Sequence, residues 1–397
     1  MKIGFITDLH LHSDDVAGEL PAYQQQVLDG IVAEVARRRL DVVLLGGDDY
    51  RHLAPHWSTA VERNANADFR LGLAKTCDVI AISGNHDMLG DHDLLGEKLR
   101  SSPFKVHHVE EPGVVTVETS SGVLHVVCLP WIRGEWTPEG EEPTEWARLV
   151  SYATAELADD LPAGTKILLA HCAMAGALLR AGQPARKTAD PALHIGDMFG
   201  SERFDAAFLG HYHHPQDIEW GGKTVAVYGG SLFVREFGEP ADKSWVVWDS
   251  VTGRYERVPV KTRAKIEIVI DPVEMEISNM RPPGTGRVPL SHLDPETIRD
   301  AEIRLIAACP TEEYEVPAEV EAIRDALTEI AYSMEYRAPK PRRVRERSGA
   351  KEVAEAETDE EKAVAFWTSL DPLPHADVAR RAMELLPELR AEIEGDA

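Results

Sequence analysis

Five short stretches of the chain carry acidic, imidazole or amide side chains directly after apolar runs that predict strands. They are Asp8–His10, Gly47–Asp48, Gly84–Asp87, His171 and Gly210–His213. Ligands gather at the carboxyl ends of the strands in an α/β sheet, so loops far apart in sequence can converge there. Carboxylate, imidazole and amide donors without a thiolate suit Mn²⁺, Fe²⁺ or Zn²⁺. We therefore predict a site for two divalent metal ions.

Each stretch is weak evidence alone, because a lone Asp-x-His is common and a lone buried histidine is usually structural. The occurrence of all five, each at a predicted strand end, favours the metal site. Two other histidines are not expected to bind metal. His12 is expected to be an exposed neighbour of the site, and His214 to have a structural or solvent-facing role. Cys172 is expected to be a small buried side chain.

The elements that must position these stretches begin with alternating strands and helices. Continuous apolar runs at Lys2–Thr7, Asp41–Leu45 and Asp78–Ser83 predict buried strands. Apolar residues at helical spacing predict helices over Pro21–Arg39 and Thr59–Lys75. Continuous apolar strands separated by helices indicate a largely parallel sheet that is covered on both faces.

A second set of strands follows from Val114. Val114–Glu118 and Val123–Leu129 predict a hairpin. Further strands are expected at Lys166–Ala170, Ala206–Leu209, Thr224–Tyr228, Ser244–Trp248 and Tyr255–Val260. Residues 1–262 are therefore predicted to form one two-sheet α/β sandwich.

The pattern restarts after this sandwich. Residues 263–336 predict a small α/β domain, with alternating apolar residues in Lys265–Ile270 and a helical stripe from Val320 to Ile330. Residues 337–358 have the charged composition of a linker. Residues 359–397 predict two short amphipathic helices, which are too small to form a core of their own.

The composition limits the classes of function. The formal net charge is −26, which disfavours nucleic-acid binding except through a local basic patch or bound metal. No apolar run approaches the roughly 20 residues that span a membrane. The first residues have no signal-peptide layout, so a cytoplasmic location is expected. The 4 cysteines are scattered, which argues against a disulfide framework.

Taken together, the five stretches resemble the calcineurin-like metallophosphoesterase superfamily, which implies an αββα two-sheet sandwich. Within it, Cys128–Trp131 and Tyr228–Glu239 resemble the SbcD nucleases, the bacterial and phage counterparts of the meiotic-recombination-eleven nuclease. The small domain followed by a helical pair resembles the architecture of that family. The resemblance is strong over residues 1–260 and architectural beyond them.

This resemblance implies a role for each donor. One cation would be held by Asp8, His10, Asp48 and His213. The other would be held by Asp48, Asn85, His171 and His211, so that Asp48 bridges the two. His86 resembles the catalytic histidine of the family that does not bind metal, and Asp87 would orient it by accepting from its ring N–H. Mn²⁺ is the expected metal.

The implied activity is that of a DNA nuclease subunit. It would hydrolyse phosphodiester bonds with water activated between the two metals. The expected activity is that of a double-strand exonuclease, and endonuclease activity is a further option. Residues 263–336 would cap the site, and 359–397 would dock on the coiled coil of an SbcC-type ABC ATPase in DNA repair, recombination or replication. A homodimer is also implied. The alternative is a small-molecule phosphodiesterase or phosphatase with the same dimetal centre, which the acidic charge suits better.

The bridging position itself has two candidates, because residues 44–52 read LLGGDDYRH. Asp48 directly follows Gly47 at the strand end and is the predicted bridge. Asp49, one residue later, is expected to point away, either supporting the metal ligands from behind or facing solvent, and its replacement by Ala is expected to cost little. If Asp49 bridged instead, His52 would fall at the family's three-residue spacing and could face the substrate. The sequence leaves the role of His52 open.

Overall fold

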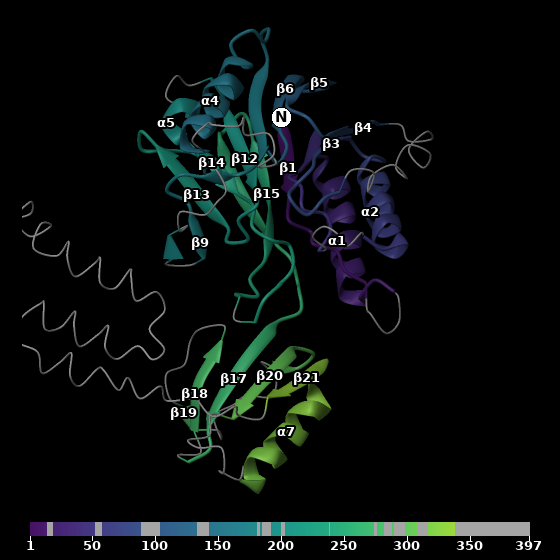
Figure 1. The fold of residues 1–397 in the computed structure, drawn as a ribbon. Helices are drawn as coiled ribbons and strands as arrows, with labels where there is room; N and C mark the ends of the chain where they lie inside the picture. The colour runs from purple at the N-terminus through teal and green to yellow at the C-terminus, as the bar shows by residue number, and fades with distance from the viewer. Residues whose placement is uncertain are drawn as a thin grey trace, which may run out of the picture.

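The computed structural model of the chain describes its residues in a series of stretches (Figure 1). These are 1–13, 19–51, 58–88, 104–132, 143–180, 183–184, 192–199, 203–237, 239–273, 276–281, 288–289, 298–307 and 317–337. The predicted helical pair at 359–397 and all but the first residue of the predicted linker at 337–358 lie outside the described residues.

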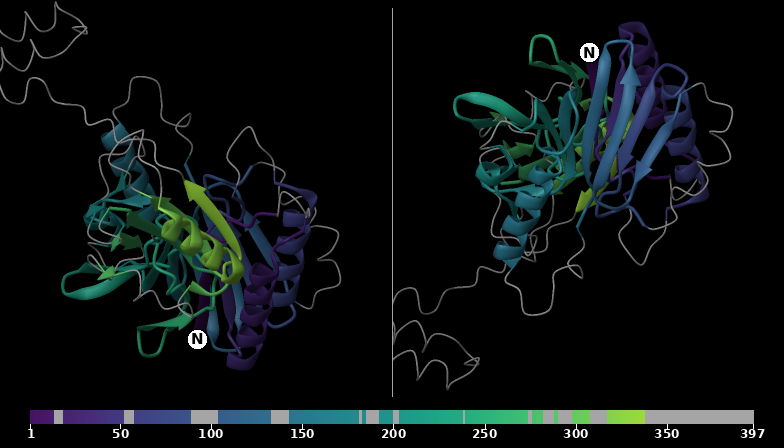
Figure 2. Two further views of the ribbon diagram at one scale, coloured as in Figure 1. Left: turned by 90° about the horizontal axis from the view of Figure 1, so that it is seen from below. Right: turned by 90° about the horizontal axis from the view of Figure 1, so that it is seen from above.

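The first sheet is six-stranded and mostly parallel. Its order is β16 (Arg254–Pro259), β15 (Ser244–Asp249), β1 (Lys2–Ile6), β2 (Val42–Leu45), β3 (Asp78–Ile82) and β4 (Val106–Val109). β1 to β4 pair in parallel, and β15 pairs antiparallel with β1. The helices α1 (Ala22–Arg38) and α2 (Ala60–Leu73) cover its outer face, as both views in Figure 2 show.

The second sheet is also six-stranded. Its order is β13 (Gln216–Trp220), β14 (Lys223–Tyr228), β12 (Ala206–Gly210), β7 (Thr165–His171), β6 (Gly122–Leu129) and β5 (Gly113–Thr119). The helices α4 (Pro143–Glu156) and α5 (Ile195–Phe199) lie on its outer side (Figure 1). Short strand pairs β8 (Ala173–Met174) with β11 (Ala192–Leu193), and β9 (Leu178–Arg180) with β10 (Gln183–Pro184), extend the loops beyond β7.

The two sheets pack face to face around a shared apolar layer. Successive side chains of a strand point to opposite faces, so a strand buried on both sides must be apolar throughout. In β2, Val42 and Leu44 enter the layer between the sheets, whereas Val43 and Leu45 pack under the helices. Across this layer the rings of Phe5 and Phe208 lie 5.3 Å apart. The described residues thus confirm the predicted two-sheet α/β sandwich.

A third sheet follows the sandwich and has its own core. Its order is β19 (Val288–Pro289), β18 (Glu276–Arg281), β17 (Lys265–Asp271), β20 (Glu302–Ala307) and β21 (Ser333–Arg337). The helix α7 (Ala318–Ile330) covers one face, where Val320 and Leu327 pack with isoleucines of β17 and β20 (Figure 1). The division of the chain at residue 262 stays a prediction.

Cationic side chains on aromatic rings join the third sheet to the sandwich. The guanidinium of Arg263 lies 4.3 Å from the ring centroid of Tyr23 in α1 and 3.3 Å from that of Tyr332. The guanidinium of Arg304 in β20 lies 3.9 Å from the ring of Phe237, in the loop after β14. Among the described residues, no helix is long and apolar enough to cross a membrane.

The elements that the sequence did not predict have weak apolar patterns. α4 buries Ala147, Ser151 and Ala155, which are small or polar and give little helical periodicity. β4 reads VHHV and its side chains are only half-buried. β13 buries a single residue of its five, Ile218. Both strands lie at sheet edges, where a strand pairs with a single neighbour and needs fewer apolar residues than a central strand.

Candidate metal centre

The five donor stretches meet at one edge of the sandwich. Asp8, Asp48 and Asn85 follow the ends of β1, β2 and β3 in the first sheet. His171 and His211 lie at the ends of the paired strands β7 and β12 in the second sheet. Backbone hydrogen bonds join the loops, since Asp8 N donates to Gly47 O at 3.0 Å. Parallel register therefore brings donors from both sheets to the same place.

One group of donors consists of Asp8, His10, Asp48 and His213. One ligand atom from each of the four lies within 4.8 Å of the others. The Nε2 atoms of His10 and His213 are 3.0 Å apart. Asp8, His10 and Asp48 are buried, and His213 is partly exposed. Two buried carboxylates that face two imidazole nitrogens form a donor set for a divalent cation.

A second group lies on the other side of Asp48. The Asn85 side-chain oxygen is 3.1 Å from His171 Nε2 and 3.1 Å from His211 Nδ1. Asp48 Oδ1 is 3.4 Å from His171 Nε2, whereas Asp48 Oδ2 is 3.5 Å from His10 Nε2. The two oxygens of one carboxylate thus face the two groups, which gives a dimetal-like site of aspartate and histidine ligands.

Backbone carbonyls fix which nitrogen each ring offers to the centre. Nδ1 lies 3.2 Å from Tyr50 O in His10 and 2.7 Å from Gly46 O in His171. A carbonyl oxygen only accepts, so Nδ1 carries the hydrogen and Nε2 is the nitrogen that can bind metal. Metal-binding histidines commonly donate their other N–H in this way. The residues present therefore fit a pair of divalent cations.

The charges at the centre are strongly coupled. Burial opposes the ionised form of Asp48, but His171 beside it holds the pKa of this carboxyl well below its usual range. Burial likewise opposes the charged form of His171, yet Asp48 raises the pKa of this imidazole to about 9. Burial lowers the pKa of His211 to about 4 and that of His213 to about 3. Most of the imidazoles are thus neutral, which is the form that binds metal.

Backbone conformation at the centre is unusual. Asp8, His10, Asp48 and His211 have φ values of 53°, 43°, 56° and 97°, in the region that L residues rarely adopt. Such strain persists only where the surroundings enforce it, and it is common at functional sites. A side chain at Gly84 would collide with the Asp48 carboxylate, so only glycine allows this close approach. Both features indicate that the fold holds these donors in place.

Asp87 has different hydrogen-bond partners from those expected. Its carboxylate accepts the backbone N–H groups of Asp48 and Asp49, both at 2.9 Å, and that of Gly84 at 2.7 Å. The Nδ1 of His86 instead lies 3.0 Å from the backbone oxygen of Arg51. The expectation that Asp87 orients the His86 ring is therefore corrected. Asp87 joins the loops after β2 and β3, and a backbone carbonyl orients His86.

Asp49 is buried and paired, which excludes the solvent-facing alternative and corrects the expectation that its replacement costs little. Its carboxylate forms an ion pair with Arg70 of α2 and accepts a hydrogen bond from Asn66 Nδ2 at 2.9 Å. Arg70 is fully buried as well. Asp49 thus points away from the metal centre, as the interpretation of Asp48 as the bridge requires. His52 lies outside the described residues.

His12 also differs from its expected exposed position. Its Nδ1 lies 2.7 Å from the side-chain nitrogen of Gln24, a fully buried residue of α1. His214 is half-buried, and its backbone oxygen accepts a hydrogen bond from Gln216 Nε2 at 3.3 Å. Cys172 is buried, as expected.

Two residues at the centre were not singled out from the sequence. The ring of Trp131 lies 4.8 Å from that of His211 at an interplanar angle of 33°. Arg235 Nη1 lies 3.0 Å from His10 Nε2. Both residues belong to the stretches Cys128–Trp131 and Tyr228–Glu239, which served only as marks of resemblance. That resemblance was the signal that could have placed them at the site.

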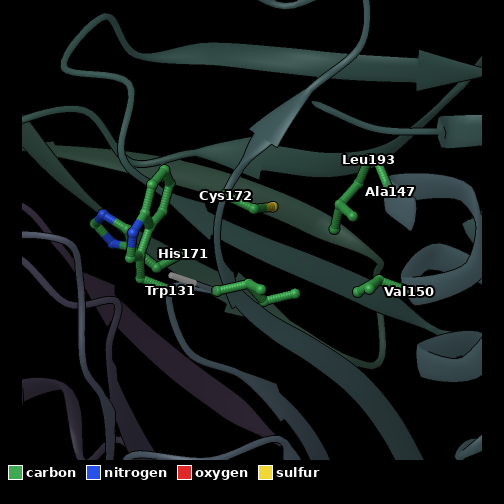
Figure 3. A pocket seen from close by; sticks show the side chains of 7 residues that line it. Trp131, Ala147, Val150, His171, Cys172 and Leu193 are labelled. Carbon is green, nitrogen blue, oxygen red and sulfur yellow. The ribbon is translucent and has the colours of Figure 1, made fainter. Parts of the chain in front are cut away.

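A small apolar pocket adjoins the centre on the side of the second sheet (Figure 3). Its lining residues are Trp131, Ile132, Ala147, Val150, His171, Cys172 and Leu193. In Figure 3, Trp131 and His171 lie together at one end, and Val150 and Leu193 lie toward the other. His171 itself is fully buried at this end of the pocket.

Comparison with known proteins gives a family and several distant folds. The model for calcineurin-like phosphoesterases matches residues 1–215. The structure of GAP50, the anchor in the inner membrane complex of Plasmodium, is similar with a TM-score of 0.41 and 11% identity, over 66% of this chain and 89% of that one. Likenesses this distant indicate no particular substrate.

Two further solved structures are similar at a comparable distance. A putative 5′-nucleotidase from Staphylococcus aureus has a TM-score of 0.39 and 18% identity, over 66% of this chain and 55% of that one. A dimetal phosphatase from Danio rerio has a TM-score of 0.35 and 11% identity, over 62% of this chain and 91% of that one.

The buried pair of Asp49 and Arg70 predicts an asymmetric effect on stability. Asp49→Ala leaves Arg70 as an uncompensated buried cation, which should lower the free energy of unfolding by about 3–5 kcal/mol. The double variant Asp49→Asn with Arg70→Met removes both charges and should recover most of that loss. Urea unfolding followed by circular dichroism measures both.

The exposed Asp29→Ala is the control for this experiment, and its stability should stay within ~0.5 kcal/mol of the wild type. If Asp49→Ala were as stable as the control and bound no metal, Asp49 would be the bridging residue.

The raised pKa of His171, about 9, predicts that metal binding depends on pH. Below that pH the ring is protonated, so a cation binding Nε2 must displace the proton. Apparent affinity should then rise by about tenfold per pH unit between pH 7 and 8, with about one proton released per chain. Calorimetric Mn²⁺ titrations in two buffers of different ionisation enthalpy measure both quantities. An affinity independent of pH would contradict this account of the Asp48–His171 pair.

Proposed function

The chain belongs to the calcineurin-like phosphoesterases, metal-dependent hydrolases of phosphoester bonds, and we propose that its substrate is DNA. One observation carries the proposal. The two stretches that resemble the SbcD nucleases both reach the metal centre, through Trp131 on His211 and Arg235 on His10. Trp131 and Arg235, which belong to the stretches that resemble the SbcD nucleases, therefore lie where they can contact a substrate bound at the metal centre.

The proposed donor sets share Asp48. Asp8, His10, Asp48 and His213 hold one cation, and Asp48, Asn85, His171 and His211 hold the other. When bound, two such cations supply an activated water and neutralise charge that builds on the phosphoryl oxygens. The chain itself holds the donors in position before metal binds. Backbone carbonyls orient the imidazoles of His10 and His171, and the strained loops after β1 and β2 place the carboxylates of Asp8 and Asp48.

His86 is proposed to deliver a proton to the leaving oxygen. Its Nδ1 is held by Arg51 O at 3.0 Å, and its Nε2 lies 4.0 Å from Asp48 Oδ2, on the side of the centre. Burial lowers the pKa of His86, so its protonated form gives up a proton readily. Asp87 acts on this step only indirectly, because it holds the backbone of the loops that carry Asp48 and His86.

The chain is further proposed to be the nuclease subunit of an SbcCD-like complex. The third sheet contacts the loop after β14 through Arg304 and Phe237, so it is proposed to cap the metal centre and to position DNA. Residues 359–397 are proposed to bind the coiled coil of an SbcC-type ABC ATPase through the two amphipathic helices that their sequence predicts. Mn²⁺ as the metal and a homodimer as the assembly belong to the same proposal.

A small-molecule phosphodiesterase or phosphatase is the second candidate, and the net charge of −26 favours it. A protein this acidic repels DNA at long range, since binding to phosphates requires local cations. The two candidates differ in substrate but share the metal centre.

A substrate comparison tests the proposal. With Mn²⁺, the protein should degrade linear duplex DNA and should turn over bis-p-nitrophenyl phosphate more slowly at equal phosphodiester concentration. Gel analysis of end-labelled DNA and absorbance of p-nitrophenolate measure the two rates. Hydrolysis of the small esters without any cleavage of DNA would favour the second candidate.

His86→Ala serves as the matched catalytic variant in this comparison. It should lower DNA cleavage by roughly 10²–10⁴-fold, the usual range for a general acid, and should leave the Mn²⁺ content unchanged. Loss of metal from this variant would mean that His86 is a ligand, which would contradict its proposed role.

A further inference from the structure

Arg235 brings a positive charge into direct contact with the metal centre. Its Nη1 lies 3.0 Å from His10 Nε2 and 3.1 Å from His213 Nε2, so it donates to the two imidazole nitrogens of the first donor group. Coulombic attraction to Asp48 and Asp8 acts on the guanidinium as well.

The contact between Arg235 and His10 excludes metal binding by the same nitrogen. His10 donates Nδ1–H to Tyr50 O, so its Nε2 has a single lone pair. That lone pair can accept an N–H of Arg235 or bind a cation, but it cannot do both. Arg235 Nη1 must therefore leave His10 Nε2 when this nitrogen binds a cation.

The guanidinium is short of partners in its present position. Arg235 Nε is buried and has no hydrogen-bond partner among the described residues. A guanidinium has five N–H donors in a planar fork that matches the oxygens of a phosphate group. A phosphoester bound at this centre would supply acceptors for Nε and Nη together.

The backbone of Arg235 is held in place by a chain of hydrogen bonds. Its backbone N–H donates to Glu239 Oε2 at 3.1 Å. The same oxygen accepts from Lys243 Nζ at 3.1 Å, and Lys243 also donates to Ser231 Oγ at 2.9 Å. Ser231 is tied to His213 by a backbone hydrogen bond of 3.2 Å. The loop that carries Arg235 is thus anchored beside the centre.

We propose that Arg235 is a phosphate-binding residue whose guanidinium moves from His10 and His213 to the non-bridging oxygens of the substrate when the first donor group binds its cation. This inference rests on the proposed function, because it takes His10 and His213 as metal ligands. It does not depend on whether the phosphoester is DNA or a small molecule.

Two calorimetric titrations test this role in the full chain. The first adds inorganic phosphate to the Mn²⁺-loaded protein. Arg235→Ala should weaken phosphate binding by about 10–100-fold, as expected for the loss of charge-assisted hydrogen bonds. Arg235→Lys keeps the charge without the fork and should restore part of the affinity. Arg148→Ala, an exposed arginine of α4 paired with Asp197, is the matched control and should bind phosphate like the wild type.

The second titration adds Mn²⁺ to the metal-free protein. Arg235→Ala should bind Mn²⁺ as tightly as the wild type or more tightly, because no guanidinium competes for His10 and His213. Unchanged phosphate affinity in Arg235→Ala, or weaker Mn²⁺ binding, would overturn the inference. Should Arg235→Ala fail to fold, Arg235→Gln of similar length takes its place in both titrations. A wild type that binds phosphate but cleaves no DNA would contradict the proposed substrate alone and leave this inference standing.

Discussion

A single buried carboxylate, Asp48, faces nitrogen donors with both of its oxygens, and the arrangement of the loops around it depends on this fact. His10 Nε2 is 3.5 Å from one oxygen and His171 Nε2 is 3.4 Å from the other. An ionised carboxylate in a protein interior is unfavourable unless cations or hydrogen bonds compensate it. His10 follows a strand of the first sheet and His171 ends a strand of the second, so both oxygens meet their partners when the sandwich brings the strand ends together. The fold and the metal centre thus stabilise each other.

The second constraint is the support behind Asp48. Asp87 accepts three backbone N–H groups and joins the loops after β2 and β3. Asp49 and Arg70 tie the first of these loops to α2 in the layer behind it. The adjacent aspartates of the sequence GGDD therefore have opposite directions and different functions. One faces the metal centre, and its neighbour fixes the loop that presents it.

Much of the fold and of the donor set could be predicted from the sequence, because their signals are local. Apolar runs gave β1, β2, β3, β7 and β12, and polar donors directly after them gave the site. The partner of Asp49 could not be predicted, because it depends on how α2 packs against the loop after β2. The partners of Asp87 could not be predicted either, because every residue except proline has a backbone N–H group and the sequence does not show which of them Asp87 meets. The orientation of His86 by the backbone oxygen of Arg51 has no sequence signal for the same reason. Arg235 was within a recognised stretch, but only the geometry connects it with His10 and His213.

The central claim is that Asp48 bridges two cations, and electron paramagnetic resonance of the Mn²⁺-loaded protein tests it most directly. The wild type should bind two Mn²⁺ per chain, as two-metal sites with ions roughly 3.5–4 Å apart do, and should give the spectrum of an exchange-coupled pair. Asp48→Ala should lose the coupled spectrum and most of the bound metal while keeping the far-ultraviolet circular dichroism of the folded chain. A folded Asp48→Ala protein that retains two coupled Mn²⁺ ions would contradict the account.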